Sequence, residues 1–158
     1  MDMGTLLVVA IAVALFALPF ILTIRSRKKK QRKLLQSLAA MADRYNSSIG
    51  QREFCGNYAI GMDPEGRFVF FEKKLKDRVE EQTVALSEVK QCKPVNIGKN
   101  VGTERTIESL GLKFVPKDTG KPEQYLEFFN HEQSFQLSGE LQSMEAWSQR
   151  INAGLKGA

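Results

Sequence analysis

The sequence predicts an α+β protein: an N-terminal transmembrane helix, then a bent antiparallel sheet of about six strands closed by a C-terminal amphipathic helix. Three observations lead to this class. An uncharged apolar run lies near the start, apolar and polar residues alternate through the middle, and apolar residues recur at three- and four-residue steps near the end. The length of 158 residues leaves room for one small domain beside the membrane span.

The run from Thr5 to Ile24, TLLVVAIAVALFALPFILTI, holds twenty residues without a charge. As a helix it would be about 30 Å long, which matches the hydrocarbon core of a bilayer. A cleaved signal peptide has a basic start and a shorter apolar core, whereas here Asp2 precedes the run and the cations follow it. We therefore expect a transmembrane anchor over residues 1–24.

A polybasic juxtamembrane segment, residues 25–33, follows the span. Its cations are Arg25, Arg27, Lys28, Lys29, Lys30, Arg32 and Lys33. Positive charge collects on the cytoplasmic side of a span, so we expect a single-pass protein of the cell inner membrane with its N-terminus outside and its C-terminal domain in the cytoplasm. The segment would act as a topology signal, and it could also contact anionic lipid headgroups.

The charge of the rest of the chain is nearly balanced. Removing the seven cations from the 23 Lys and Arg leaves 16, against 17 of the 18 Asp and Glu, so residues 34–158 have a net charge of −1. The overall charge of +5 is thus a property of residues 25–33. We expect no nucleic-acid partner.

Apolar residues at helical spacing continue beyond the basic segment. They are Leu34, Leu35, Leu38, Met41, Ala42, Tyr45 and Ile49. The spacing predicts a connecting amphipathic helix over residues 34–50, ended by the polar stretch from Asn46 to Gly50. This helix would either continue from the span or follow a short break. The apolar stripe would pack on the membrane interface or on the domain, and Tyr45 favours the domain.

Residues 51–158 form the predicted domain. Residues 54–62 and 67–72 alternate around the turn Asp63-Pro64-Glu65-Gly66, which is typical of a hairpin. Further strands are predicted at 81–86, 89–97, 107–115 and 124–130, with a polar loop at 98–103 and a second hairpin turn at 117–122.

The C-terminal helix is predicted from apolar residues three and four positions apart. They are Leu137, Leu141, Met144, Trp147, Ile151 and Leu155. Ser138 is placed as its N-cap, and Glu140 falls in the first turn. We expect Trp147, Leu141, Met144 and Ile151 to belong to the structural core, because a helix with one apolar stripe must cover a sheet.

The order of these elements and the segment MEAWSQRINAGL resemble the pleckstrin-homology (PH) superfold, in which a C-terminal helix with a tryptophan plugs a bent sheet. The layout is also similar to small uncharacterised bacterial proteins with one span and a cytoplasmic β-rich domain, through AIGMDPEGRFVFF and QTVALSEVKQC. Phosphoinositide-binding PH domains place several cations around the loop between the first two strands. The turn matched here has only Arg67 beside it, so no specific phosphoinositide site is implied.

No residues are spaced as a catalytic or metal site, so no catalytic residue, metal or cofactor is predicted. The single histidine, His131, has polar neighbours typical of a solvated loop. Cys55 and Cys92 are too few for a zinc site, and we expect free thiols, with a disulfide only if the topology were reversed. Asp118-Thr119-Gly120 matches the aspartic-protease tripeptide, but the following Lys121-Pro122 is typical of a hairpin turn.

These observations predict a membrane-anchored cytoplasmic binding or scaffolding module without catalytic activity. Its expected partners are the membrane lipid bilayer and an unidentified protein near the inner membrane face, bound by strand addition at a sheet edge or on the helix flank. The alternative is a structural subunit of a membrane complex that packs through its span, where Ala10, Ala12, Ala14 and Ala17 allow close approach of helices. An enzyme acting on a lipid or nucleotide is the least favoured hypothesis.

Overall fold

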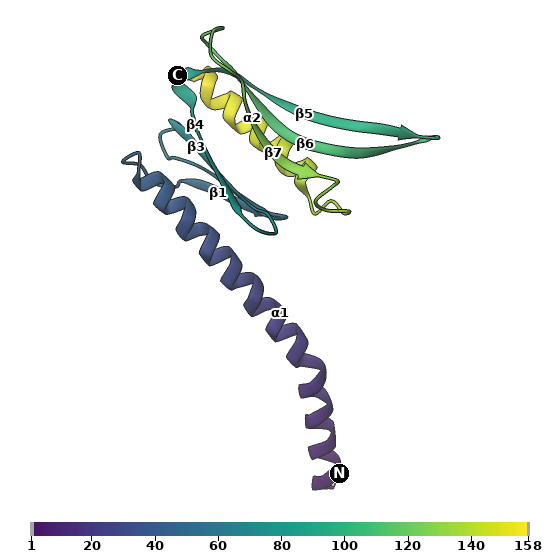
Figure 1. Ribbon diagram of the computed structural model, residues 1–158. Helices are drawn as coiled ribbons and strands as arrows, with labels where there is room; N and C mark the ends of the chain where they lie inside the picture. The colour runs from purple at the N-terminus through teal and green to yellow at the C-terminus, as the bar shows by residue number, and fades with distance from the viewer. Residues whose placement is uncertain (1, 158) are drawn as a thin grey trace. The chain divides into compact units, whose positions relative to one another are not determined.

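The computed structural model describes residues 2–157 and divides into two compact units at the boundary between Gln36 and Ser37. Its class is α+β (Figure 1). The helices are α1 (Met3–Asp43) and α2 (Glu140–Lys156), with a short 3-10 turn at Leu86–Glu88. The strands are β1 (Gln51–Cys55), β2 (Tyr58–Met62), β3 (Phe68–Lys74), β4 (Val79–Ala85), β5 (Val89–Val101), β6 (Glu104–Pro116) and β7 (Gln124–Asn130).

The first unit is helical from Met3 onward. Its helix contains a stretch long and apolar enough to cross a membrane. The helix predicted over residues 34–50 continues directly from the span, which is one of the two possibilities considered, because α1 runs without a break to Asp43. The residues after the span are good helix formers without Gly or Pro, so nothing interrupts the helix until Asn46, whose φ of 54° is left-handed and lies outside it.

Seven strands form two antiparallel sheets, ordered β1-β2-β3-β4 and β5-β6-β7. The prediction of one sheet with about six strands is therefore wrong in strand count and in the number of sheets. Gly56, with a φ of 53°, makes a two-residue turn with Asn57 that divides the first predicted strand into β1 and β2. The 3-10 turn at Leu86–Glu88 ends the first sheet and starts the second.

The predicted loop at residues 98–103 is also wrong. β5 and β6 pair as far as Val101 and Glu104, and Gly102 provides the positive φ of 65° that their two-residue turn needs. β7 pairs with β6 only from Ser109 onward, so residues 98–107 form a two-stranded arm (Figure 1). The sequence predicted a loop here because few apolar residues mark the two strands of the arm. In the structure most of these residues are exposed, which is why apolar side chains are few.

The two sheets and α2 enclose one hydrophobic core. Tyr58 of β2 and Phe71 of β3 meet Phe128 of β7, with ring centroids 4.5 Å apart for Tyr58–Phe128 and 5.5 Å apart for Phe71–Phe128. From α2, Trp147, Met144 and Ile151 are buried in this core and Leu141 is partly buried against it.

Polar bonds attach α2 to both sheets. The indole Nε1 of Trp147 donates to Glu53 Oε2 of β1 at 3.1 Å, and Tyr58 donates to the hydroxyl of Ser143 at 2.7 Å. On the second sheet, the side-chain amide of Asn152 accepts from the N–H of Cys92 at 2.9 Å and donates to its carbonyl at 2.7 Å. The helix therefore bridges β1 and β2 to β5.

The predicted N-cap is wrong by one residue. α2 begins at Glu140 with Gly139 as N-cap, and Gly139 has a φ of 99°, which excludes most side chains. The backbone N–H of Ser138 donates to the Glu140 carboxylate, so the acidic side chain reaches back to the residues before the helix.

The outer face of the first sheet is covered by the last turns of α1. Leu38, Met41 and Ala42 are buried, and the Tyr45 ring lies 5.0 Å from that of Phe68. Of the two destinations considered for the apolar stripe, these residues of the second unit pack on the domain.

Replacing Trp147, the single tryptophan, by Ala should cost about 3–5 kcal/mol, because it empties a large aromatic site and removes the donor to Glu53. The measurement is thermal unfolding of the full chain in detergent, with Trp147→Phe as a milder control that keeps the ring volume partly filled. The wild-type fluorescence should be blue-shifted. Water-exposed emission together with an unchanged Tm would contradict this role of the indole.

Candidate functional site

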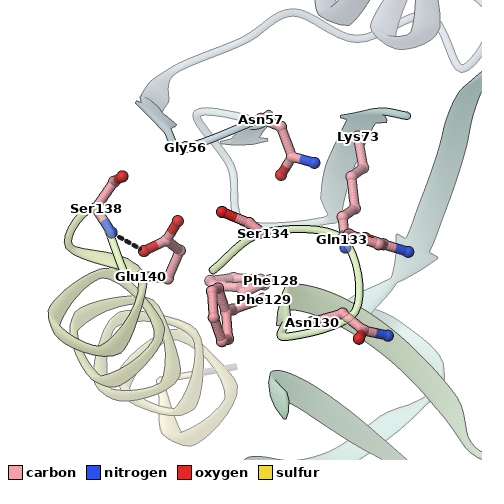
Figure 2. A pocket seen from close by; sticks show the side chains of 10 residues that line it. All are labelled: Gly56, Asn57, Lys73, Phe128, Phe129, Asn130, Gln133, Ser134, Ser138 and Glu140. Carbon is pink, nitrogen blue, oxygen red and sulfur yellow. Dashed lines mark hydrogen bonds between the residues drawn. The ribbon is translucent and has the colours of Figure 1, made fainter. Parts of the chain in front are cut away.

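A polar pocket of about 280 Å³ lies where the β1–β2 turn, the end of β3, the end of β7 and the start of α2 come together (Figure 2). Its floor is aromatic, and its walls carry amide, hydroxyl and charged groups. The lining residues used below are Gly56, Asn57, Lys73, Phe128, Asn130 and Glu140.

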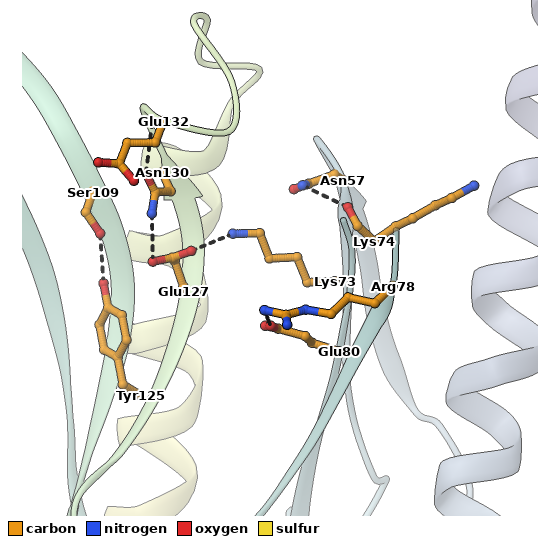
Figure 3. Close-up of polar contacts among 10 residues, drawn as sticks. All are labelled: Asn57, Lys73, Lys74, Arg78, Glu80, Ser109, Tyr125, Glu127, Asn130 and Glu132. Carbon is orange, nitrogen blue, oxygen red and sulfur yellow. Dashed lines mark hydrogen bonds and ion pairs between the residues drawn. The ribbon is translucent and has the colours of Figure 1, made fainter. Parts of the chain in front are cut away.

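The ammonium group at this pocket is already paired. Lys73 is buried, and its Nζ lies 3.0 Å from Glu127 Oε1 on the other sheet (Figure 3). Asn130 donates to the second oxygen of the same carboxylate at 3.3 Å. A buried lysine without a partner would be costly, so Glu127 serves to keep the charge of Lys73 inside the seam between the sheets.

The carboxylate at the opposite wall is also held by the fold. Glu140 is the first residue of α2, where a negative charge is stabilised by the helix dipole. Its Oε1 would lie 2.5 Å from a Cβ at Gly56, where the positive φ of 53° already favours glycine. The charged groups of the pocket thus stabilise the junction of the two sheets and α2.

Among the described residues, the two cysteines and the histidine do not form a catalytic group with one another. Cys55 and Cys92 are free thiols, and desolvation raises the pKa of both, that of Cys92 to about 12. His131 lies in the turn after β7, half-buried, with its ring centroid 5.8 Å from that of Phe135 and the two rings nearly perpendicular. The loop position predicted for His131 is correct, but Phe135 partly covers the ring. Within residues 2–157 no three His, Cys, Asp or Glu side chains are grouped as a metal site.

The turn at residues 63–66 joins β2 and β3, not the first two strands. Arg67 is engaged by two carboxylates, Asp63 at 3.0 Å and Glu65 at 3.1 Å. Burial would raise the pKa of Asp63, but hydrogen bonds from the backbone and guanidinium of Arg67, from the N–H of Phe68 and from Ser47 outweigh it and lower that pKa. The cation next to this turn is therefore part of a structural network.

The seven basic residues from Arg25 to Lys33 are exposed along α1, in the first unit. The four residues predicted for the core are in the second unit, on α2. The structure thus places the two predicted sets in separate units of the chain.

The sheet edges are the surfaces where this domain can make new backbone hydrogen bonds. β4 and β7 are linked by Gln124, whose side chain donates to the carbonyl of Thr83 at 3.3 Å, and β3 is linked to β7 by the Lys73–Glu127 pair. At β5, α2 occupies the backbone of Cys92. Beyond that point, β5 has β6 as its neighbour on one side and, among the described strands, none on the other.

This outer edge of β5, residues 94–101, was missed by sequence reasoning because its second half, residues 98–101, was assigned to a loop. The signal that could have found it is the alternation in KPVNIGKNV, in which Val95, Ile97 and Val101 fall on odd positions. Ile97 is 51% exposed and Val101 is 63% exposed.

No protein-family model, curated protein or solved structure matches the chain.

A buried carboxyl on the outer face of the first sheet adds a pH-dependent term to stability. Glu72 is 4% exposed, and its Oε2 has no hydrogen-bond partner among the described residues. It faces Ser37 of α1 and lies directly across from Glu81 of β4, which is itself 3.2 Å from Arg44. Desolvation raises the pKa of Glu72, Ser37 lowers it by a hydrogen bond, and Glu81 raises it, with a net upward shift.

Because the folded-state pKa of Glu72 lies above its ordinary value of 4.5, the folded chain binds the proton more tightly than the unfolded chain. Stability should therefore fall as the pH rises from about 4.5 through the folded-state pKa. Glu72→Gln should raise the Tm at pH 7.5 and have a smaller effect at pH 4.5. The exposed Glu145→Gln is the matched control, and an equal shift at both pH values would contradict the account.

Proposed function

We propose that this chain is a membrane-anchored binding or scaffolding module without catalytic activity, held at the cytoplasmic face of the cell inner membrane. The N-terminal part of α1 is the anchor, and the basic residues after it set the orientation. The folded β domain of the second unit binds a protein partner.

The order of the elements supports a PH-like assignment for the domain. Four strands, then three strands, then a helix whose tryptophan is buried between the sheets follow one another along the chain. The engagement of Arg67 by Asp63 and Glu65 argues against a phosphoinositide as ligand, because a multiply charged headgroup needs several unpaired cations. This favours a protein over a lipid headgroup as partner.

The observation that carries the proposal is the outer edge of β5. A free edge presents unpaired backbone N–H and C=O groups, which bind an extended segment of another chain by strand addition. The charged groups of the polar pocket already have partners within the fold. The backbone groups on the outer edge of β5, in contrast, have no neighbouring strand among the described strands.

The orientation can be checked with reporters fused after Ala158. We expect a fluorescent reporter that folds only in the cytoplasm to be active and a periplasmic phosphatase fusion to be inactive, because seven cations follow the span. Replacing the seven cations by Gln should lower the fraction of chains with this orientation. Phosphatase activity of the unchanged chain would overturn the proposed location.

Partner binding can be tested by purification from detergent extracts of three membrane-inserted chains. They are the full chain, the chain with residues 5–24 replaced by an unrelated span, and residues 1–33 alone. We expect the first two to enrich the same protein and the third to enrich none of it. Loss of the partner on exchange of the span would instead favour a structural subunit, and no enrichment by the full chain would overturn the proposal.

A further inference from the structure

We propose that the outer edge of β5, residues 94–101, binds an extended acidic segment of a partner protein as an additional strand of the β5-β6-β7 sheet. This inference rests on the proposed function and assigns it a surface and a ligand chemistry.

The backbone of β5 is prepared for a strand on this side. Backbone groups of alternate residues in a strand point to the same edge. Cys92 directs its N–H and carbonyl away from β6, toward Asn152, so the groups of Asn96, Gly98 and Asn100 point to the same side. At the register shift in the arm, the extra residue, Glu108, is in β6. The alternating direction of the backbone groups along β5 is therefore unbroken as far as the tip of the arm.

The same bonds define where the site begins. Asn152 fills the position of a neighbouring strand at Cys92, and Pro94 has no N–H to offer. From Asn96 onward the described structure shows one contact on this edge, between the Asn96 carbonyl and Arg105 Nη2 at 3.5 Å. The side chain of Arg105 is exposed and can move aside for a stronger partner.

The side chains of the edge specify the chemistry of the ligand. Lys93 directly precedes the edge and lies on the same face of β5 as Val95, Ile97 and Lys99, which gives the order basic, apolar, apolar, basic. β5 carries three lysines and no acidic residue. Cross-strand neighbours of opposite charge and apolar β-branched pairs stabilise a sheet, so the complementary strand is acidic at its ends and apolar between them.

Two other occupants fit the edge less well. In a pairing of two copies centred on Asn96, Lys93 would lie opposite Lys99, and like charges in that position destabilise a sheet. A bilayer would attract the lysines, but its hydrocarbon core offers no acceptors for the N–H groups of Asn96, Gly98 and Asn100.

The test uses the full chain in detergent micelles and fluorescein-labelled nine-residue peptides. The probe is TETVTVTET, whose acidic and apolar side chains match the face of β5 in either direction. TKTVTVTKT reverses its charges, and TETVPVTET places a proline where the central residue would donate an N–H to β5. Fluorescence anisotropy should show binding of the first peptide and little binding of the other two.

The variants Lys93→Glu and Lys99→Glu should each weaken binding of TETVTVTET about five- to tenfold. Lys76→Glu, which makes the same charge change at an exposed position between β3 and β4, should leave binding unchanged. Binding of TKTVTVTKT by the two edge variants would be the reciprocal result.

The inference is overturned if all three peptides bind alike, if none binds, or if the Lys76→Glu control weakens binding as much as the edge variants do. It is also overturned if phosphatidylserine vesicles bind the chain through Lys93 and Lys99 while the peptides do not, since the edge would then be a lipid surface. If the purification experiment enriches a partner but TETVTVTET does not bind, the assignment of the binding site to β5 is wrong and the proposed binding function stands. If the peptides bind but no cellular partner is enriched, the edge is competent and the proposed function is wrong.

Discussion

The bonds that α2 makes to both sheets are the constraint on which the rest of the domain depends. A four-stranded and a three-stranded sheet are each too small to bury their own apolar faces, so they share one core. Trp147 fills that core and reaches Glu53 on β1, while Asn152 holds the backbone of β5. One helix thus positions two sheets that β-strand hydrogen bonds do not connect to each other.

The contacts that hold the two sheets together also determine which sheet edge remains available to a partner. Gln124 links β4 to β7, the buried Lys73–Glu127 pair links β3 to β7, and α2 bonds to Glu53 of β1 and to the backbone of Cys92 in β5. β5 is longer than the helix covers, so its outer half extends along the arm (Figure 1). A domain held near a membrane by its own anchor would meet membrane-associated partners at a raised effective concentration, which allows weak strand addition to suffice.

The helices could be predicted from sequence because their signals are local. The uncharged run at residues 5–24 and the spacing of Met144, Trp147 and Ile151 each depend on neighbouring positions. The arrangement of the sheets depends on a two-residue turn at Gly56 and on contacts such as that of Glu53 with Trp147. Those two residues are 94 positions apart, and such a contact produces no periodic pattern in the sequence. The outer end of the free edge was missed for a related reason: beyond Ile97 both faces of the arm lie in water, and few apolar residues mark its strands.

Amide hydrogen exchange along β5, measured on the full chain in detergent, tests most directly whether α2 closes one half of this edge and leaves the other open. We expect slow exchange at Cys92, whose N–H donates to Asn152, and fast exchange at Asn96, Gly98 and Asn100. Asn152→Ala should speed the exchange of Cys92 alone within this strand, provided that the core amides remain protected. Equal protection of all four amides in the free chain would contradict the account.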